Sequence, residues 1–129
     1  MSTVSKWVMT LGIIFIIVGI WGFIQNPILG IFLVGVSHNW VHLITGILAV
    51  IFASQGEVSA KQFSKVFGVL YGLLTIYGFF VPGDIYFGFL RANNADDWLH
   101  LVFAVIFLYL GFSHVYGVHR PMQEAHARG

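Results

Sequence analysis

Two matching stretches decide the fold of this chain: Asn39-Trp40-Val41-His42-Leu43 and Asp97-Trp98-Leu99-His100-Leu101. Each stands at the start of a long apolar run and places an imidazole one helical turn into that run. Asn and Asp side chains commonly cap the free amides in the first turn of a helix, so Asn39 and Asp97 are expected to be N-caps. The pairing predicts two helices that begin in the same way, 58 positions apart.

The composition is that of a membrane protein. Hydrophobic residues make up 58% of the 129 residues, charged residues make up 9%, and the mean hydropathy is +0.87. A soluble domain carries about 25% charged residues. The charged residues here all fall between or outside the long apolar runs, as expected when hydrocarbon is the solvent. The absence of cysteine excludes disulfides and thiolate chemistry, and no basic patch points to nucleic acid.

Four apolar runs are predicted to be transmembrane helices. A bilayer core of about 30 Å needs about 20 helical residues, and the runs cover residues 7–24, 40–54, 66–81 and 98–116. Prolines follow the first and third runs and are expected to end those helices. The fold class is therefore all-α, a four-helix transmembrane bundle that forms a single integral membrane domain over residues 1–129, with the lipid bilayer as its first partner.

The connections between these helices differ in character. Residues 55–65 are polar and are expected to form an exposed loop. The segment from Ile28 to Ser37 is apolar, but it is too short to span, and Gly30 and Gly35 disfavour a helix. It is expected to lie at the interface or to re-enter the membrane, folded against the bundle.

The halves of the chain are predicted to be hairpin repeats, over about residues 7–54 and 66–112. At an offset of 58, Trp40 aligns with Trp98 and His42 with His100, whereas the first helices of the two halves align poorly. A two-helix unit leaves its successor in the same orientation. The halves should therefore be related by a pseudo-twofold axis along the membrane normal.

Basic residues predict the orientation in the membrane. One side carries only Arg91. The other side carries five basic residues: Lys6, Lys61, Lys65, Arg120 and Arg128. Because positive charge accumulates on the cytoplasmic side, both termini are expected to be cytoplasmic, in a bacterial inner membrane or a photosynthetic membrane.

Small residues predict which helix faces meet, because transmembrane helices associate through close contact at Gly and Ala. His42 and His100 lie on such stripes, so both are expected to point inward, at matching depth. The stripes are Gly46, Ala49 and Ala53 after His42, and Ala104, Phe107 and Gly111 after His100. Gly12 and Gly19 on the first helix, and Gly68 and Gly72 on the third, are expected to be the partners of these stripes.

The two inward histidines leave several functions open. In a structural role, His42 and His100 reach back to the caps at Asn39 and Asp97 or bond loop backbone. In a cofactor role, His42 and His100 ligate a haem, a chlorophyll or a metal, with Asp97 orienting His100 and His38 adding a third nitrogen. Two histidines alone make an incomplete metal site, so no metal ligand set is assigned from the sequence.

Other kinds of chemistry have less support in the sequence. A small transporter or a pH-responsive protein would use the same histidines, but no acidic residue lies in the middle of an apolar run. His114, His119 and His126 lie toward the opposite end and cannot share a site with His100. No catalytic constellation is recognisable, so the protein is expected not to be an enzyme and to have no catalytic residues.

The paired Asn/Asp-x-x-His-Leu elements, at residues 39–43 and 97–101, resemble those of a family of small bacterial and cyanobacterial four-span membrane proteins classed as a domain of unknown function. The similarity covers roughly residues 8–112. It implies a four-helix membrane bundle and brings no catalytic residues. The function expected first is a non-catalytic accessory or stabilising subunit of a larger membrane complex, or a homo-oligomer, and the cofactor-binding role of His42 and His100 is the alternative.

Overall fold

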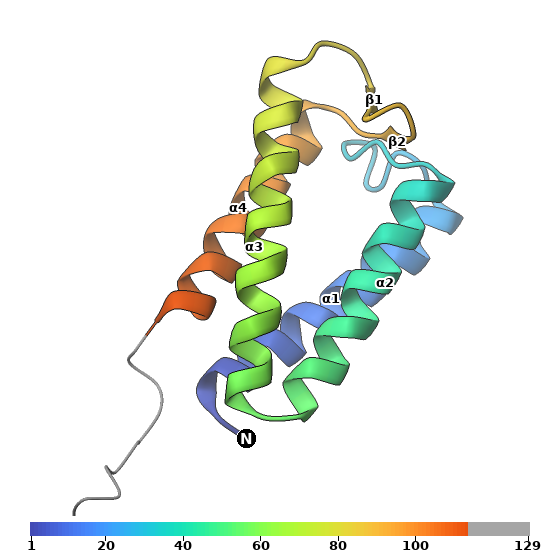
Figure 1. Ribbon diagram of the computed structural model, residues 1–129. Helices are drawn as coiled ribbons and strands as arrows, with labels where there is room; N and C mark the ends of the chain where they lie inside the picture. The colour runs from blue at the N-terminus through green and yellow to red at the C-terminus, as the bar shows by residue number, and fades with distance from the viewer. Residues whose placement is uncertain (114–129) are drawn as a thin grey trace, which may run out of the picture.

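The structure, a computed structural model, describes residues 1–113, which form four α-helices in two contacting pairs, α1 with α2 and α3 with α4 (Figure 1). The helices are α1 Thr3–Ile24, α2 Val36–Ser54, α3 Glu57–Phe80 and α4 Asn94–Phe112, and two short strands, β1 Ile85–Tyr86 and β2 Leu90–Arg91, join α3 to α4. Each helix is long and apolar enough to cross a membrane. The expectation of an all-α membrane fold with four spans is confirmed at this level.

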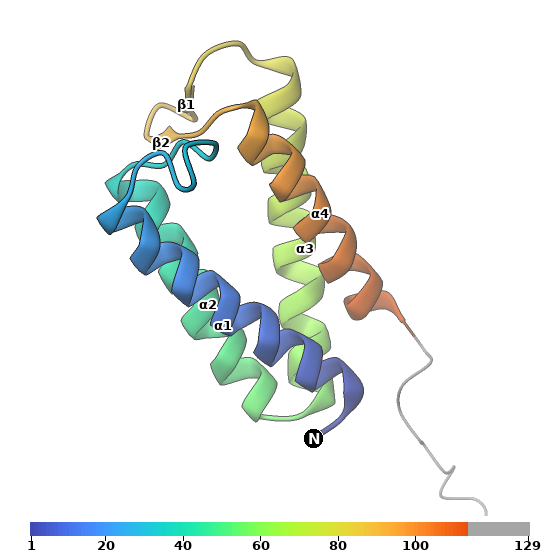
Figure 2. The same cartoon turned by 180° about the vertical axis from the view of Figure 1, so that it is seen from behind.

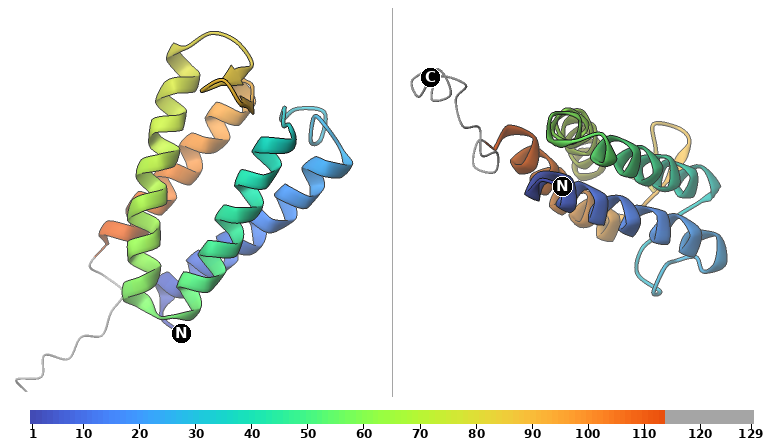
Figure 3. Two further views of the ribbon diagram at one scale, coloured as in Figure 1. Left: turned by 45° about the vertical axis from the view of Figure 1, so that its right-hand side comes forward. Right: turned by 90° about the horizontal axis from the view of Figure 1, so that it is seen from below.

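The connections lie at the two ends of the helices. The N-terminus and the turn between α2 and α3 are at one end, and the α1–α2 and α3–α4 connections are at the other (Figures 1 and 2). Figure 3 shows the two hairpins side by side, joined at the lower end by the α2–α3 turn. The described basic residues follow this division, with Lys6, Lys61 and Lys65 toward the lower end and Arg91 in the upper loops.

All four helices begin earlier than the sequence pattern predicts. α2 begins at Val36 after Gly35, and α4 begins at Asn94 after Asn93. The Asn93 side chain accepts a hydrogen bond from the Asp96 amide at 3.1 Å, and the Asp96 carboxylate accepts one from the Asn93 amide at 2.9 Å. This reciprocal capping box starts α4 one turn before Asp97. The predictions that Asn39 and Asp97 are N-caps are therefore wrong.

The prediction that residues 55–65 form a loop is also wrong, because α3 starts at Glu57. Its first turns are polar yet helical, and the Lys61 ammonium lies 3.4 Å from the Glu57 carboxylate, one turn away. α4 ends at Phe112, with Ser113 extended, and Tyr116, where the predicted helix ended, lies outside the described residues.

Asn39 and Asp97 instead lie buried where the two helices of each hairpin meet. Asn39 packs on Gly22 of α1, and Asp97 packs on Gly78 of α3, so tightly that a Cβ on either glycine would overlap the facing side chain. Asp97 also accepts a hydrogen bond of 2.6 Å from the hydroxyl of Tyr86 in the outer loop. These polar residues join helix to helix, and Asp97 also joins helix to loop.

Glycines bring the helices of each pair into backbone contact, as the small-residue stripes predict. A Cβ on Gly46 would lie 2.6 Å from the Gly12 carbonyl oxygen, and one on Gly68 would lie 2.8 Å from Leu108. The α2 and α4 stripe residues are buried. Gly72 is the exception, since a Cβ there would meet nothing within 4 Å. It lies away from the helix contact, and its predicted packing role is wrong.

The apolar segment after α1 folds into a tight turn. Leu29 and Gly30 both have positive φ, 55° and 70°, inside a turn closed by the Ile31 amide on the Ile28 carbonyl at 3.0 Å. Two consecutive positive φ values are typical of a type I′ hairpin turn. Ile28 is 4% exposed and Val34 is fully buried, so the segment is folded against the helices, as expected.

The α3–α4 loop has the same geometry 58 positions later. Phe87 and Gly88 have φ values of 53° and 82°, and the Phe89 amide donates to the Tyr86 carbonyl at 3.1 Å. The register Ile28↔Phe32 matches Tyr86↔Leu90. Both loops therefore use the same type of turn.

Corresponding contacts in the first helices recur at 56 positions instead of 58. Gly22 and Gly78 pack on the matching Asn39 and Asp97. The edge-on ring pair of Phe23 with Trp40 has its counterpart in Phe79 with Trp98, at centroid distances of 5.7 and 5.2 Å. The second hairpin thus has two extra residues between its first helix and its turn. This change of register explains why the first helices align poorly at a single offset.

Candidate metal site

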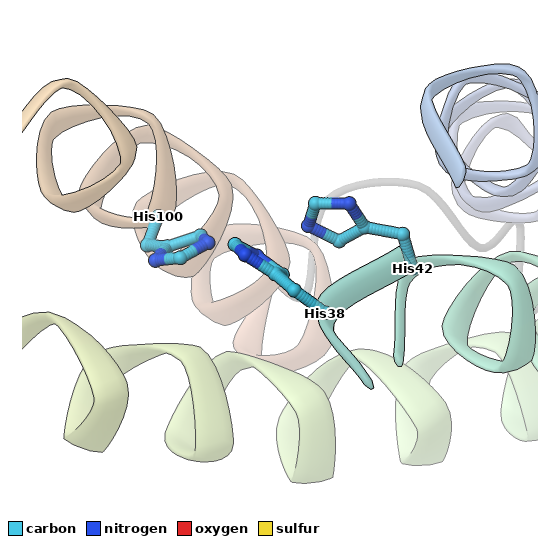
Figure 4. A group of neighbouring side chains, drawn as sticks. All are labelled: His38, His42 and His100. Atoms are coloured by element: carbon cyan, nitrogen blue, oxygen red, sulfur yellow. The ribbon is translucent and has the colours of Figure 1, made fainter. Parts of the chain in front are cut away.

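Three histidine side chains converge between the two hairpins, at the end of the helices that carries the long loops. One ring nitrogen from each of His38, His42 and His100 lies within 4.8 Å of the others. The side chains are 1%, 2% and 1% exposed. Figure 4 shows His38 and His42 on α2, and His100 reaching toward them from α4. The cluster therefore bridges one hairpin to the other.

The early start of α2 makes this arrangement. Because α2 begins at Val36, His38 is already helical and lies one turn before His42, on the same face. Their ring centroids are 4.3 Å apart. His100 lies on the buried face of α4, with its ring centroid 5.4 Å from that of His38 and 6.3 Å from that of His42.

A backbone carbonyl from the second hairpin orients His38. The Nδ1 atom of His38 lies 2.7 Å from the carbonyl oxygen of Arg91, at the end of β2. A carbonyl can only accept, so Nδ1 carries the proton and Nε2 presents its lone pair. Histidine ligands of metals are typically held in this way, by a hydrogen bond on the nitrogen that does not bind the metal.

Four of the other five ring nitrogens of the cluster are buried without partners among the described residues. They are Nε2 of His38, Nδ1 of His42, and both Nδ1 and Nε2 of His100. Buried polar groups nearly always have a hydrogen-bond partner, because leaving one unpaired costs about 1–3 kcal/mol. Several unpaired nitrogens in one buried cluster are consistent with a site that an additional group would complete.

Aromatic side chains enclose the cluster. Phe15 of α1 meets His42 edge-on at 5.7 Å between ring centroids, and Tyr71 of α3 lies 5.6 Å from His100. The Tyr71 hydroxyl is within 3.1 Å of the Thr45 hydroxyl, so its hydrogen bond is directed away from the histidines. All four helices therefore contribute to the surroundings, and the low polarity strengthens any charge–ligand interaction inside.

The arrangement is close to that of a three-histidine metal site. Zn–N bonds of about 2.0–2.1 Å in a tetrahedral site place ligand nitrogens about 3.3 Å apart. The nitrogens here lie within 4.8 Å, so small side-chain rotations would close the site. His38 occupies the space between His42 and His100 (Figure 4), and that space is where a haem or chlorophyll ring ligated by both would have to lie. The geometry fits a single ion rather than a macrocycle.

The structure gives Asp97 a different place from the one expected. Its Oδ1 accepts from Tyr86, and it makes no hydrogen bond with His100, whose nitrogens are both unpartnered. Asp97 therefore does not orient His100 as an outer carboxylate would. His42 and His100 are inward and buried, as expected. His114, His119 and His126 lie outside the described residues.

His38 is the residue whose role the sequence interpretation underestimated. Its spacing to His42 is His-x-x-x-His, which is a strong signal for two ligands on one helical face. The sequence interpretation names His38 only as a third nitrogen and does not recognise the His38–His42 pair. Apart from the repeat, no local sequence pattern predicts that His100 lies beside His38 and His42.

The comparisons with known proteins give a family and leave the site unassigned. A family profile described as "Domain of unknown function (DUF4383)" matches residues 6–113. No curated protein and no solved structure matches the chain.

Proposed function

The chain belongs to the DUF4383 family, and we propose that it is an integral membrane protein that binds one transition-metal ion through His38, His42 and His100. The observation that carries this proposal is the convergence of three buried histidines, each with one ring nitrogen within 4.8 Å of the others, in a cluster where four ring nitrogens have no partner among the described residues. The hydrogen bond from His38 to the Arg91 carbonyl supports it, because it leaves Nε2 of His38 free to bind.

The ligand set favours a borderline metal. Three neutral imidazoles suit Zn²⁺, Cu²⁺ or Fe²⁺ and do not suit Mg²⁺ or Ca²⁺, which prefer oxygen ligands. A three-histidine site also leaves a coordination position for a further ligand. Zinc is the simplest probe, because it has no redox chemistry of its own.

The first consequence of metal binding would be a link between the two hairpins. Two ligands come from α2 and one from α4, so a bound ion would join the two hairpins near their loop ends. This role needs no catalysis and agrees with the expectation that the protein is not an enzyme. A ligand that binds only the folded state stabilises it, by about 2.7 kcal/mol when its concentration is one hundred times Kd.

Metal content of purified protein tests the proposal. The protein, purified in mild detergent without a histidine tag and dialysed against Zn²⁺, is expected to retain one zinc per chain. His38→Ala, His42→Ala and His100→Ala should each lower the affinity at least about tenfold, because each removes one of three bonds to the ion. Co²⁺ in place of zinc should give the strong visible absorption of a tetrahedral complex with the wild-type chain.

The histidines outside the described residues supply the matched control. A variant with His114, His119 and His126 all changed to Ala should keep its zinc and its Co²⁺ spectrum. Each His→Gln variant at the site retains polarity and similar size, and so separates lost metal binding from lost packing. A wild-type protein that holds no more zinc than the three site variants would refute the proposal.

The accessory role expected from the sequence stays a prediction beside this proposal. Large apolar side chains are exposed on all four helices, among them Ile17, Trp40, Leu73 and Val105, and contact with lipid alone accounts for them. A subunit of a larger complex should co-purify with a large membrane partner in mild detergent. A chain that stays alone at every detergent strength would contradict the accessory role and leave the metal proposal untouched.

A further inference from the structure

One pocket is lined both by His42 of the histidine cluster and by exposed apolar side chains of α1 and the first loop. It has a volume of about 190 Å³ and lies between α1, the first loop and α4. Its polar lining residues are His42 and Asp96, and its aromatic ones are Trp21, Phe32 and Phe103. At its rim, Ile14 and Trp21 of α1 are 40% and 37% exposed, and Leu29 of the loop is 57% exposed. The mouth is thus apolar and would face the bilayer.

The inner end of this pocket has unused hydrogen-bonding capacity. Asp96 is 1% exposed, and only its Oδ2 is engaged, by the Asn93 amide of the capping box. Among the described residues no donor meets its Oδ1. His42 lies at the same end and presents the unpartnered Nδ1. An occupant would therefore find one carboxylate acceptor beside the histidine cluster.

A second pocket has no such unused hydrogen-bonding capacity. It lies between α2 and α3, has a volume of about 320 Å³, and is lined by Leu70 among other apolar residues. Its polar members, Thr45 and Tyr71, already hydrogen-bond each other. Lipid chains can fill that pocket without leaving a polar group unpaired, so it needs no specific ligand.

We propose that the pocket at His42 and Asp96 binds a small membrane-soluble quinol or phenol, with its hydroxyl at the inner end. The apolar mouth admits a molecule dissolved in lipid. The three aromatic side chains favour a flat ring, since aromatic pairs are attracted beyond their buried area. The hydroxyl would donate to the second carboxylate oxygen of Asp96, in a pocket that His42 of the histidine cluster also lines.

The proposal rests on the metal site for its inner end, but it is tested separately. The zinc-loaded wild-type chain is titrated anaerobically with tetramethylhydroquinone, and binding is followed by quenching of tryptophan fluorescence. Saturable one-to-one binding is expected. Tetramethylbenzene has the same ring without hydroxyls and should bind at least about tenfold more weakly, as expected when a buried polar group is left unpaired.

Matched variants locate the binding. Leu99→Trp fills this pocket and should abolish saturable binding, whereas Leu70→Trp fills the second pocket and should leave it unchanged. Asp96→Asn should weaken the quinol and have little effect on tetramethylbenzene. Trp21→Phe should remove most of the quenching, because Trp21 lines this pocket.

The outcomes distinguish the two proposals. A chain that holds zinc but shows no saturable quinol binding, or binding that Leu99→Trp does not alter, refutes the quinol pocket and leaves the metal site standing. A chain that holds no zinc refutes the metal site. If that chain also binds tetramethylhydroquinone no better than tetramethylbenzene, the quinol pocket is refuted with it.

Discussion

Asp97 shows how a single buried acid can secure a loop to a membrane helix. Its Oδ1 accepts a hydrogen bond from Tyr86, which is 1% exposed although it lies in the outer loop. Burial, followed by the hydrogen bond and the charge of Asp97, raises the pKa of the Tyr86 hydroxyl above its ordinary value of about 10. Tyr86 therefore keeps its proton and acts as the donor throughout the physiological pH range.

Removing this donor should loosen the loop. Tyr86→Phe keeps the ring but leaves Oδ1 of Asp97 without its partner, so we expect the free energy of unfolding to fall by about 1–3 kcal/mol. Unfolding in mixed detergent micelles, followed by circular dichroism, measures the change. The double variant Tyr86→Phe/Asp97→Asn should lose less than the sum of the two single variants, because the two side chains share one interaction. Wild-type stability in Tyr86→Phe would contradict this role.

The position of His38 depends on residues outside the repeated sequence elements. His42 and His100 are recognisable from the repeat, but His38 acquires its role from the register of α2 and from one carbonyl of β2. Its counterpart at the matching position of the second hairpin is Asp96, which closes the capping box instead. One repeated position thus supplies a candidate metal ligand in one hairpin and a helix cap in the other.

At the scale of elements, each hairpin is held by backbone contact at glycine. The α1–α2 contact centres on Gly12 and Gly46, and the α3–α4 contact on Gly68 and Gly111. Lipid supplies no hydrophobic reason for helices to associate, so close packing must do so. Gly72 has the same residue type and lies free of any contact, which makes it a natural reference.

Two glycine-to-alanine variants should distinguish the effect of helix contact on stability from the effect of helix propensity. Gly46→Ala places a methyl 2.6 Å from the Gly12 carbonyl oxygen, so we expect the free energy of unfolding to fall by about 1–3 kcal/mol through overpacking. Gly72→Ala adds a methyl in open space and should be neutral or stabilising by up to about 1 kcal/mol, because alanine favours helix. Both variants are compared by unfolding in mixed micelles, and equal effects would rule out the packing role.

At the scale of the whole molecule, the ends of the helices differ in charge and function. The upper end holds the paired loops, the histidine cluster and the quinol pocket, and the lower end holds the described lysines. The Asn93 side chain donates to the Ile31 carbonyl at 2.9 Å, which ties one loop to the other above the site. The positive charge at the lower end predicts that this end is cytoplasmic, and in that orientation the proposed site would lie near the outer surface.

Cysteine labelling tests this orientation cleanly, because the chain has no cysteine of its own. Gln55→Cys places a thiol in the α2–α3 turn, and Asp84→Cys places one in the α3–α4 loop, both at exposed positions. In intact bacterial cells a membrane-impermeant maleimide should label Asp84→Cys and leave Gln55→Cys unlabelled until the cells are broken. The reverse pattern would invert the orientation, and labelling of both in intact cells would contradict a membrane-spanning arrangement.

The sequence alone determined the number and approximate place of the spans, the recurrence of one helical-hairpin pattern at an offset of 58, and the inward direction of His42 and His100. These features depend on composition, on periodicity and on small residues along one helix face, and all of these act over a few turns of chain. It placed the helix starts wrongly because Gly35 and Asn93 look like loop residues, while polar Asn39 and Asp97 look like caps.

Only the tertiary structure decided that His38 joins the cluster, that Asn39 and Asp97 pack against glycines, and that the repeat shifts register by two residues in its first helix. Each of these depends on contacts between segments far apart in the chain, such as His38 with the Arg91 carbonyl. A local pattern cannot specify such contacts, because the position of α2 relative to β2 and α4 is set by packing of the whole bundle.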